Sequence, residues 1–281
     1  MGQIRGRREF LQVAAAGAAA CCGLATGCAS AQPAKTDKPR FELGLASYTL
    51  RKFDLAKTIE LTKRVGLKHI ALKDVHLAMN STPEQIQAAA AKVRDAGLDL
   101  YGCGVVYMAD EAAVNRAFEY AKAGGMKVII GVPQKPELLP LLDKKVKEYD
   151  IKVAIHNHGP GDKLFPLPSD VYAKVKDLDP RIGLCNDIGH TLRAGGDLIA
   201  SILDFGDRLH DIHFKDVSAA NPKGGAVEMG RGVIDIPAVM RALVKIGYAG
   251  IASFEYEKDA DDPVPGLAES VGYARGVMAT I

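Results

Sequence analysis

Cysteine is scarce in this sequence: five occur in 281 residues, and three of them, Cys21, Cys22 and Cys28, fall near the N-terminus. The other two, Cys103 and Cys185, each lie inside an apolar, strand-like run. Two isolated cysteines cannot supply the paired sets of zinc fingers or a disulfide framework. We therefore expect two buried free thiols in the folded domain.

An excess of charge of one sign is also lacking. The chain has 36 basic and 34 acidic residues, and residues 1–31 contain Arg5, Arg7, Arg8 and Glu9 among them. Without that segment the counts become 33 and 33, so the remainder is formally neutral. A nucleic-acid groove needs surplus Lys and Arg to displace condensed counterions, so no nucleic-acid partner is expected.

No apolar run is long enough to suggest a membrane span. The Ala-rich stretch from Val13 to Ala20 is far shorter than the ~20 residues that a spanning helix needs. This stretch follows the pair Arg7-Arg8, and the two features together predict a twin-arginine export signal over residues 1–31. We therefore expect a periplasmic or cell-envelope protein.

The cleavage site has two alternatives. Ala29–Ala31 fits an ordinary signal peptidase, whereas Cys28 ends a loose lipoprotein-like box and would carry a lipid anchor. We favour cleavage after Ala31. Residues 32–40 are polar with two prolines and predict a flexible tether, so the folded domain should span residues 41–281.

Strand-like and helix-like segments alternate along this domain. Apolar, β-branched runs of parallel-strand length are separated by stretches rich in Ala, Leu, Lys and Glu at helical spacing. The predicted strands are Glu42–Ser47, His69–Leu72, Asp99–Val106, Lys127–Val132, Lys152–Asn157, Ile182–Asp187, Asp211–Lys215 and Ile251–Glu255. The predicted helices are Leu55–Val65, Pro83–Ala96, Glu111–Ala123, Glu137–Tyr149, Ser169–Lys176, Leu198–Phe205 and Pro237–Ile246.

This alternation predicts an α/β fold, a single-domain (β/α)₈ TIM barrel, whose active site lies at the C-terminal ends of the strands. The main alternative is an open, doubly wound sheet. That fold would carry a glycine-rich dinucleotide loop after its first strand, where this chain has the glycine-free segment Ser47–Arg51. The barrel is therefore preferred.

Polar clusters follow four of the predicted strands. They are His156-Asn157-His158, Asp187-Ile188-Gly189-His190, His213-Phe214-Lys215-Asp216 and Glu255-Tyr256-Glu257. The strands of a parallel barrel end at one rim, so the clusters should meet there. Buried polar groups are costly unless they are paired or hold a metal. We therefore predict one divalent-metal site formed by His156, Asp187, His213 and Glu255.

The same segments resemble a known family. The segments Leu184–His190, His213–Asp216, Gly230–Asp235 and Ser253–Glu255 are similar to those of the sugar phosphate isomerase/epimerase family, whose members have a xylose isomerase-like TIM barrel. The resemblance runs from about Phe41 to the C-terminus. It implies a small carbohydrate substrate and one divalent cation, with manganese first and cobalt, magnesium or zinc as alternatives.

The position after strand five departs from the family pattern. The resemblance implies metal ligands Glu, Asp, His and Glu after strands five to eight, and the last three match Asp187, His213 and Glu255. The first falls on His156. Ketose epimerases of this family use two metal-bound Glu residues on opposite faces of the substrate, and a coordinated imidazole is a poor carboxylate-like base. With histidine at position 156, a mechanism in which a single base removes a proton from one face of the substrate is still expected to be available.

We expect a metal-dependent sugar enzyme that removes a proton beside a carbonyl. The first expectation is a lyase, because a 3-keto-glycoside has an acidic hydrogen at C2 and a leaving group at C1, and some members that resemble this chain split such sugars. An isomerase or epimerase for a ketose or related small sugar is the alternative. A non-catalytic metal- or sugar-binding protein is the alternative of another class.

The candidate catalytic residues lie at or just beyond strand ends. They are Glu255, His158, Lys215 and Lys73. Each has a side chain that would accept or deliver a proton beside a metal-bound carbonyl. Lys73 follows the second strand, where burial would lower the pKa of its amine.

The candidate substrate-binding residues come from several loops. They are His76, Tyr107, His190 and Arg231. Arg231 lies between two glycines that would let the backbone approach a sugar. Glu257 and Asp216 are expected to orient ligands or to cap loops. Gly- and Ala-rich helix faces would allow a homodimer.

Overall fold

The computed structural model describes residues 39–281 of the chain. The predicted export signal over residues 1–31, its two processing alternatives and nearly all of the predicted tether lie outside the described residues. Within residues 39–281, no helix combines the length and the apolar character that crossing a membrane requires.

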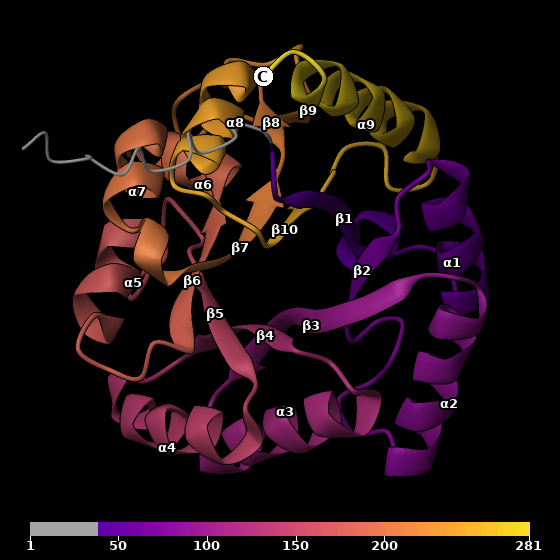
Figure 1. Ribbon diagram of the computed structural model, residues 1–281, viewed down its shortest axis with the longest axis vertical. Coiled ribbons are helices and arrows are strands. Elements are labelled where there is room, and N and C mark those ends of the chain that lie inside the picture. The colour runs from indigo at the N-terminus through magenta and orange to yellow at the C-terminus, as the bar shows by residue number, and fades with distance from the viewer. Residues whose placement is uncertain (1–38) are drawn as a thin grey trace, which may run out of the picture. The chain divides into compact units, whose positions relative to one another are not determined.

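Eight strands close into a barrel at the centre of the described chain (Figure 1). They are β1 (Glu42–Ala46), β2 (His69–Leu72), β3 (Asp99–Met108), β4 (Val128–Pro133), β5 (Lys152–His156), β6 (Ile182–Asp187), β7 (Leu209–Phe214) and β10 (Ile251–Phe254). Their order around the barrel is β1-β10-β7-β6-β5-β4-β3-β2, and every neighbouring pair is parallel. The predicted TIM barrel is confirmed.

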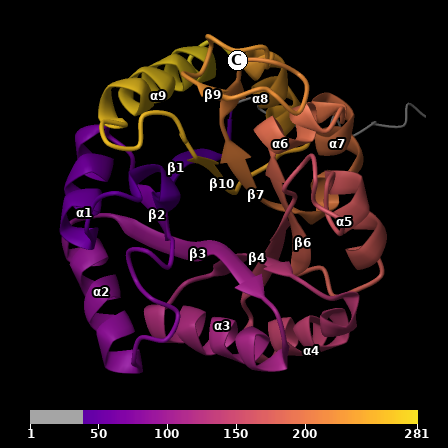
Figure 2. The same ribbon diagram turned by 180° about the vertical axis from the view of Figure 1, so that it is seen from behind.

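Helices surround the strands on the outside of the barrel (Figures 1 and 2). They are α1 (Leu55–Arg64), α2 (Pro83–Asp95), α3 (Glu111–Gly124), α4 (Leu139–Tyr149), α5 (Pro168–Val175), α6 (Ile188–Arg193), α7 (Leu198–Asp204), α8 (Ile236–Lys245) and α9 (Val264–Met278). The sequence did not predict α6 or α9. Helix α9 lies between α8 and α1 and completes the ring of helices (Figure 1).

Acidic and hydroxyl side chains define where several helices begin. The carboxylates of Asp54, Asp110 and Asp235 each accept a hydrogen bond from a backbone N–H in the first turn of α1, α3 and α8. Thr82 and Gln85 form a reciprocal capping box at α2. These caps satisfy backbone N–H groups that have no partner inside the helix. They therefore define the residue at which each helix begins after its loop.

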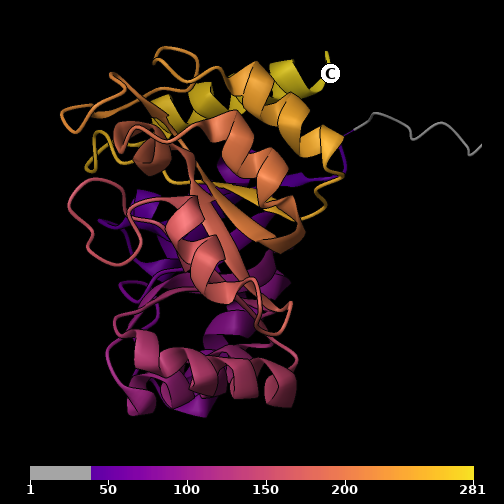
Figure 3. The same cartoon turned by 90° about the vertical axis from the view of Figure 1, so that its left-hand side faces the viewer.

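Side-chain alternation along the strands places polar residues inside the barrel. On β7 the buried Asp211 and His213 alternate with Ile212 and Phe214, and successive side chains of a strand point to opposite faces. Figure 3 shows that the loops after β5 and β7 project from the same end of the barrel. The small antiparallel pair β8 (Asp216–Val217) and β9 (Ala226–Val227) belongs to the second of these loops.

Candidate metal centre and active-site cleft

Four ionisable side chains meet at the C-terminal ends of neighbouring strands. They are His156 from β5, Asp187 from β6, His213 from β7 and Glu255, which directly follows β10. One candidate ligand atom of each lies within 4.8 Å of the others, and all four side chains are buried. The structure therefore brings together all four residues that the sequence predicted as metal ligands.

The distances between these groups show how closely they converge. His156 Nε2 lies 3.0 Å from His213 Nδ1 and 3.3 Å from Asp187 Oδ2. His213 Nδ1 lies 3.1 Å from Glu255 Oε2. Strand register produces this arrangement, because Asp187 on β6 is paired directly with His213 on β7.

Lys215 adds a positive charge to the cluster. Its Nζ lies 2.8 Å from Asp187 Oδ2, 2.7 Å from Glu255 Oε2 and 2.6 Å from Glu257 Oε1. Burial lowers the pKa of Lys215, but the surrounding carboxylates outweigh this effect and hold its pKa well above the usual value. The ammonium therefore stays charged at neutral pH.

The two carboxylates of the cluster stay ionised although they are buried. Burial raises the pKa of Asp187, but the charges of Lys215 and His190 bring its pKa well below the usual value. Burial likewise raises the pKa of Glu255, and the charges of His213 and Lys215 more than reverse this. Two negatively charged carboxylates, those of Asp187 and Glu255, therefore lie together in the buried cluster.

The pKa values of the two imidazoles shift in opposite directions. Burial and the neighbouring His213 lower the pKa of His156 to about 3, so His156 is neutral at neutral pH. Burial also lowers the pKa of His213, but the negative charge of Glu255 and a hydrogen bond to it give a net rise. A neutral imidazole is the form of histidine that ligates metals.

The four residues fit a divalent cation. Buried carboxylates that converge on one place need a compensating cation. Two imidazole nitrogens and two carboxylate oxygens form a donor set that suits zinc and other first-row divalent ions. The buried His, Asp and Glu cluster is therefore a candidate site for one such ion.

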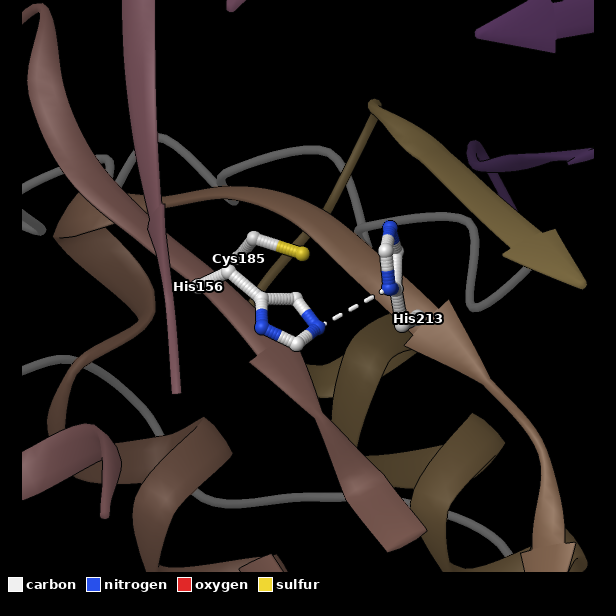
Figure 4. A group of neighbouring side chains, drawn as sticks. All are labelled: His156, Cys185 and His213. Atoms are coloured by element: carbon white, nitrogen blue, oxygen red, sulfur yellow. Dashed lines mark hydrogen bonds between the residues drawn. The ribbon is translucent and has the colours of Figure 1, made fainter. Parts of the chain in front are cut away.

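Cys185 also lies beside the two histidines of the cluster. Figure 4 shows its sulfur close to His156, with the hydrogen bond between His156 and His213 drawn as a dashed line. Burial and the charge of Asp211 raise the pKa of this thiol well above its usual value, and Sγ donates to Asp211 Oδ1 at 3.7 Å. Both Cys103 and Cys185 are buried and free, as the sequence predicted.

Asp187 is held by backbone contacts on its other side. Its Oδ1 accepts a hydrogen bond from the backbone N–H of His190 at 2.7 Å, which makes Asp187 the N-cap of α6. The Asn157 side chain accepts from the backbone N–H of Asp187 and donates to Thr191. These contacts turn Asp187 Oδ2 toward the cluster. Sequence reasoning did not assign a role to Asn157 or Thr191.

A cleft of about 310 Å³ opens above the cluster. Of the residues predicted to be catalytic or substrate-binding, those that line it are Lys73, Tyr107, His158, His190 and Glu255. Tyr48 and Glu257 complete its polar wall. The ligands His156 and Glu255 belong to both the cluster and the cleft, so an ion held by the cluster would contact a molecule bound in the cleft.

Tyr107 and His158 form a pair at the mouth of the cleft. The Tyr107 hydroxyl and His158 Nε2 are hydrogen-bonded at 2.9 Å, and the two rings are stacked. Tyr107 is 51% exposed. It lies on β3, which continues to Met108, two residues beyond its predicted end. Burial and the nearby His190 lower the pKa of His158.

Lys73 also lines the cleft, beside Tyr107. Its Nζ donates to the carbonyl of Val105 at 2.9 Å and pairs with Asp74 at the same distance. The ammonium also lies 5.7 Å from the centre of the Tyr107 ring. Lys73 is thus held in place at the cleft with one N–H still able to meet a bound molecule.

Three of the predicted residues do not line the cleft. His76 is bonded to the Ser47 hydroxyl and to the carbonyl of Leu50. The Arg231 side chain is 64% exposed and forms an ion pair with Glu269. Lys215 points into the cluster, beneath the cleft wall.

Asp216 organises the loop that follows β7. Its Oδ1 accepts hydrogen bonds from the backbone N–H groups of Val217 and Ile234, and its Oδ2 accepts from those of Gly230 and Gly232. The carboxylate is buried. This arrangement agrees with the loop-capping role predicted for Asp216, and it holds the chain next to Lys215.

Comparisons with known proteins agree on the fold. The chain is similar to the rhizopine catabolism protein MocC of Rhizobium meliloti, with 26% identity over 149 residues, which are 48% of this chain and 44% of MocC. It is also similar to the inosose dehydratase of Lacticaseibacillus casei, with 25% identity over 194 residues, which are 54% of this chain and 65% of the dehydratase. The chain therefore spans less than two thirds of the length of either relative.

Two solved structures show the same fold at low identity. The apo form of 3-keto-D-glucoside 4-epimerase YcjR from E. coli has a TM-score of 0.68 and 16% identity, covering 84% of this chain and 99% of YcjR. The IOLI protein with a bound zinc atom has a TM-score of 0.70 and 19% identity, covering 85% and 99%. A family model described as Xylose isomerase-like TIM barrel matches residues 51–277. The chain belongs to the Xylose isomerase-like TIM barrel family.

Proposed function

We propose that the protein is a metal-dependent lyase that removes a proton beside the carbonyl of a 3-keto-glycoside. The observation that carries the proposal is the buried cluster of His156, Asp187, His213 and Glu255 at the base of a polar cleft. A site of this kind combines a place for an ion with room for a small carbohydrate above it.

The cluster would hold one divalent cation. When bound, such an ion polarises a carbonyl oxygen and makes the neighbouring C–H acidic. Manganese is the ion that the family resemblance favours. The presence of His156 instead of a carboxylate gives the site two nitrogen donors, which suits zinc and cobalt as well.

His158 is the proton acceptor that the site favours over Glu255. Lys215 and His213 keep the pKa of Glu255 well below its usual value, which makes this carboxylate a weak base. His158 lines the cleft, and its lowered pKa leaves the imidazole neutral near neutral pH. A neutral imidazole within reach of the substrate meets both requirements for a general base.

Elimination then needs one proton to leave carbon and one to reach the departing oxygen. The Tyr107 hydroxyl, hydrogen-bonded to His158 Nε2 in the structure, turns toward the departing oxygen, which frees the Nε2 lone pair. His158 Nε2 then takes the C2 proton, the C–H electron pair forms a C1=C2 double bond, and the C1–O bond breaks as Tyr107 gives its proton to the departing oxygen. The Tyr107 oxygen regains a proton from His158. The products are an unsaturated keto-sugar and the free alcohol.

The remaining wall residues would bind and orient the sugar. Lys73 Nζ has one N–H beyond its bonds to Val105 and Asp74, and this N–H would donate to a sugar oxygen. His190 lines the cleft beside Asp187 and would contact a hydroxyl close to the ion. We assign both residues to substrate binding.

The names of two relatives support this choice of chemistry. Inosose dehydratase is named for the removal of water, which is an elimination, and YcjR is named for a 3-keto-D-glucoside. The predicted export also supports it, because oxidised glycosides are met outside the cytoplasm. An isomerase or epimerase is the second candidate, since YcjR is named as an epimerase.

The proposal is tested by proton NMR of manganese-loaded protein with a panel of 3-keto-glycosides and ketoses in heavy water. A lyase releases the alcohol as the C2 signal disappears. Exchange of the C2 proton without release, or with inversion of a centre, would identify an isomerase or epimerase instead. No exchange on any sugar, despite a bound ion, would identify a binding protein.

Two histidine variants locate the base. We expect His158→Gln to lower the rate by about 10²-fold or more, the usual contribution of a general base. His210→Gln is the matched control, because His210 lies at the opposite end of β7 and bonds to the carbonyl of Pro180. Equal rates for the two variants would remove His158 from the mechanism.

A further inference from the structure

Lys215 lies on the same atoms that a metal ion would need. Its ammonium is 2.8 Å from Asp187 Oδ2 and 2.7 Å from Glu255 Oε2, and these oxygens belong to two of the four candidate ligands. Both oxygens are within 3.3 Å of an imidazole nitrogen of the cluster. An ammonium and a divalent cation cannot share these oxygens at such distances without strong repulsion.

A third carboxylate, that of Glu257, also contacts the ammonium of Lys215. Glu257 Oε1 is 2.6 Å from Lys215 Nζ, and Glu257 does not belong to the four-residue cluster. Its side chain is 37% exposed and lines the cleft. A dication on Asp187 and Glu255 balances their two charges, and Glu257 then balances Lys215.

The surroundings of Lys215 give its chain a defined path. A Cβ atom on Gly189 would lie 2.7 Å from Lys215 Cγ and 2.8 Å from its Cδ, so any other residue at position 189 would press on the lysine. The backbone on the other side is held by the four hydrogen bonds to Asp216. The backbone and the first side-chain carbons of Lys215 are therefore held in place. Its Nζ lies among three carboxylates and can exchange its contacts between them.

We propose that Lys215 is an internal cation that competes with the divalent ion for Asp187 and Glu255, and that Glu257, which already contacts the ammonium, keeps it when the ion displaces it from the other two carboxylates. The pair of Lys215 and Glu257 then sets the metal affinity of the site. Because Glu257 lines the cleft, an ammonium held by Glu257 alone lies at the wall of the cleft, where it can reach a bound sugar. The inference rests on the metal site of the proposed function.

The competition is tested by titrating manganese into the full-length protein at pH 7.5 after treatment with EDTA. We expect Lys215→Met to bind manganese about tenfold more tightly or better, because it removes a positive charge next to the ion. Glu257→Gln removes the alternative acceptor and should weaken binding about tenfold. The matched control Lys145→Met should change the affinity less than about twofold, because Lys145 lies on α4, pairs with Glu148 and belongs to neither the cluster nor the cleft.

The two variants make opposite predictions, so a folding defect in one does not decide the outcome. A lysine that only orients the carboxylates predicts weaker binding in Lys215→Met, and weaker or unchanged binding would overturn the inference. Unchanged affinity in Glu257→Gln would remove the acceptor role. If the wild-type protein binds no divalent ion, the proposed metal site itself fails, and this result is distinct from either variant outcome.

Discussion

Replacing His156 with glutamate should make the stability of the protein depend strongly on a divalent ion. His156 Nε2 lies 3.3 Å from Asp187 Oδ2, and the low pKa of about 3 keeps the imidazole neutral. A carboxylate about 4 Å from Asp187 would repel it by about 4 kcal/mol at an effective dielectric constant near 20. Protonation limits this cost, because raising a glutamate pKa from about 4.3 to about 7 corresponds to about 3.7 kcal/mol.

We therefore expect His156→Glu to lose about 4 kcal/mol of unfolding free energy in EDTA at pH 7. Manganese should restore most of it, because a third carboxylate attracts the ion, and the manganese affinity should rise about tenfold or more. Urea unfolding with EDTA and with manganese measures both effects. His156→Gln adds no charge and serves as the control. The reasoning is refuted if the two variants are equally stable in EDTA.

Three further predictions follow from single groups. Cys185→Ser should leave the manganese affinity unchanged within about threefold in the same titration, because the thiol keeps its proton and donates to Asp211; a loss of more than about tenfold would make the thiolate a ligand. Asp216→Ala should lower the free energy of unfolding in urea by about 3 kcal/mol, because the buried N–H groups of Val217 and Ile234 lose a charged acceptor. At the more exposed Gly230 and Gly232, water replaces the carboxylate as the acceptor. A cost below about 1 kcal/mol would show that the carboxylate does not hold the loop. A hydrogen bond from Arg181 lowers the pKa of Asp179 to about 2 from an ordinary 3.8, so this carboxylate stabilises the fold above pH 3.8 and loses that effect as the pH falls toward 2. Asp179→Asn should thus cost about 1 kcal/mol at pH 6 after allowance for solvent screening, and equal stability to the wild type at pH 6 would contradict this.

The barrel was predictable because each strand carries a strong local signal. Segments such as Lys152–His156 have an apolar, buried centre at Val153–Ile155 and end in a polar cluster. Helix α6 was missed because it has only six residues, and its N-cap is Asp187, the residue that the sequence assigned to the metal. Helix α9 was missed because the predicted helices were placed only between strands, whereas α9 follows the last one.

The positions of the ligand cluster and of most residues in the cleft wall were predictable from strand ends, whereas the contacts of Lys215 were not. His156, Asp187, His213 and Glu255 come together because parallel strands end at one rim. Their roles as ligands stay predictions. Lys215 follows the same alternation as His213, but its contact with three carboxylates depends on the length and path of its side chain.

Loop residues depend on contacts that are distant in sequence. Arg231 pairs with Glu269 on α9, a partner 38 positions away that no local pattern marks. His76 is bonded to Ser47 and Leu50 of the first loop, again through a distant contact. Manganese as the ion, the homodimer and the exported location stay predictions from the sequence.

The central claim is that His156, Asp187, His213 and Glu255 hold one divalent ion beneath the cleft. The most direct test is X-ray diffraction from crystals of manganese-loaded protein, with data on both sides of the manganese absorption edge. The account predicts one anomalous peak per chain within coordination distance of all four side chains. It is contradicted if no peak appears at the cluster, or if the ion is bound elsewhere, such as at the acidic loop of Asp259, Asp261 and Asp262.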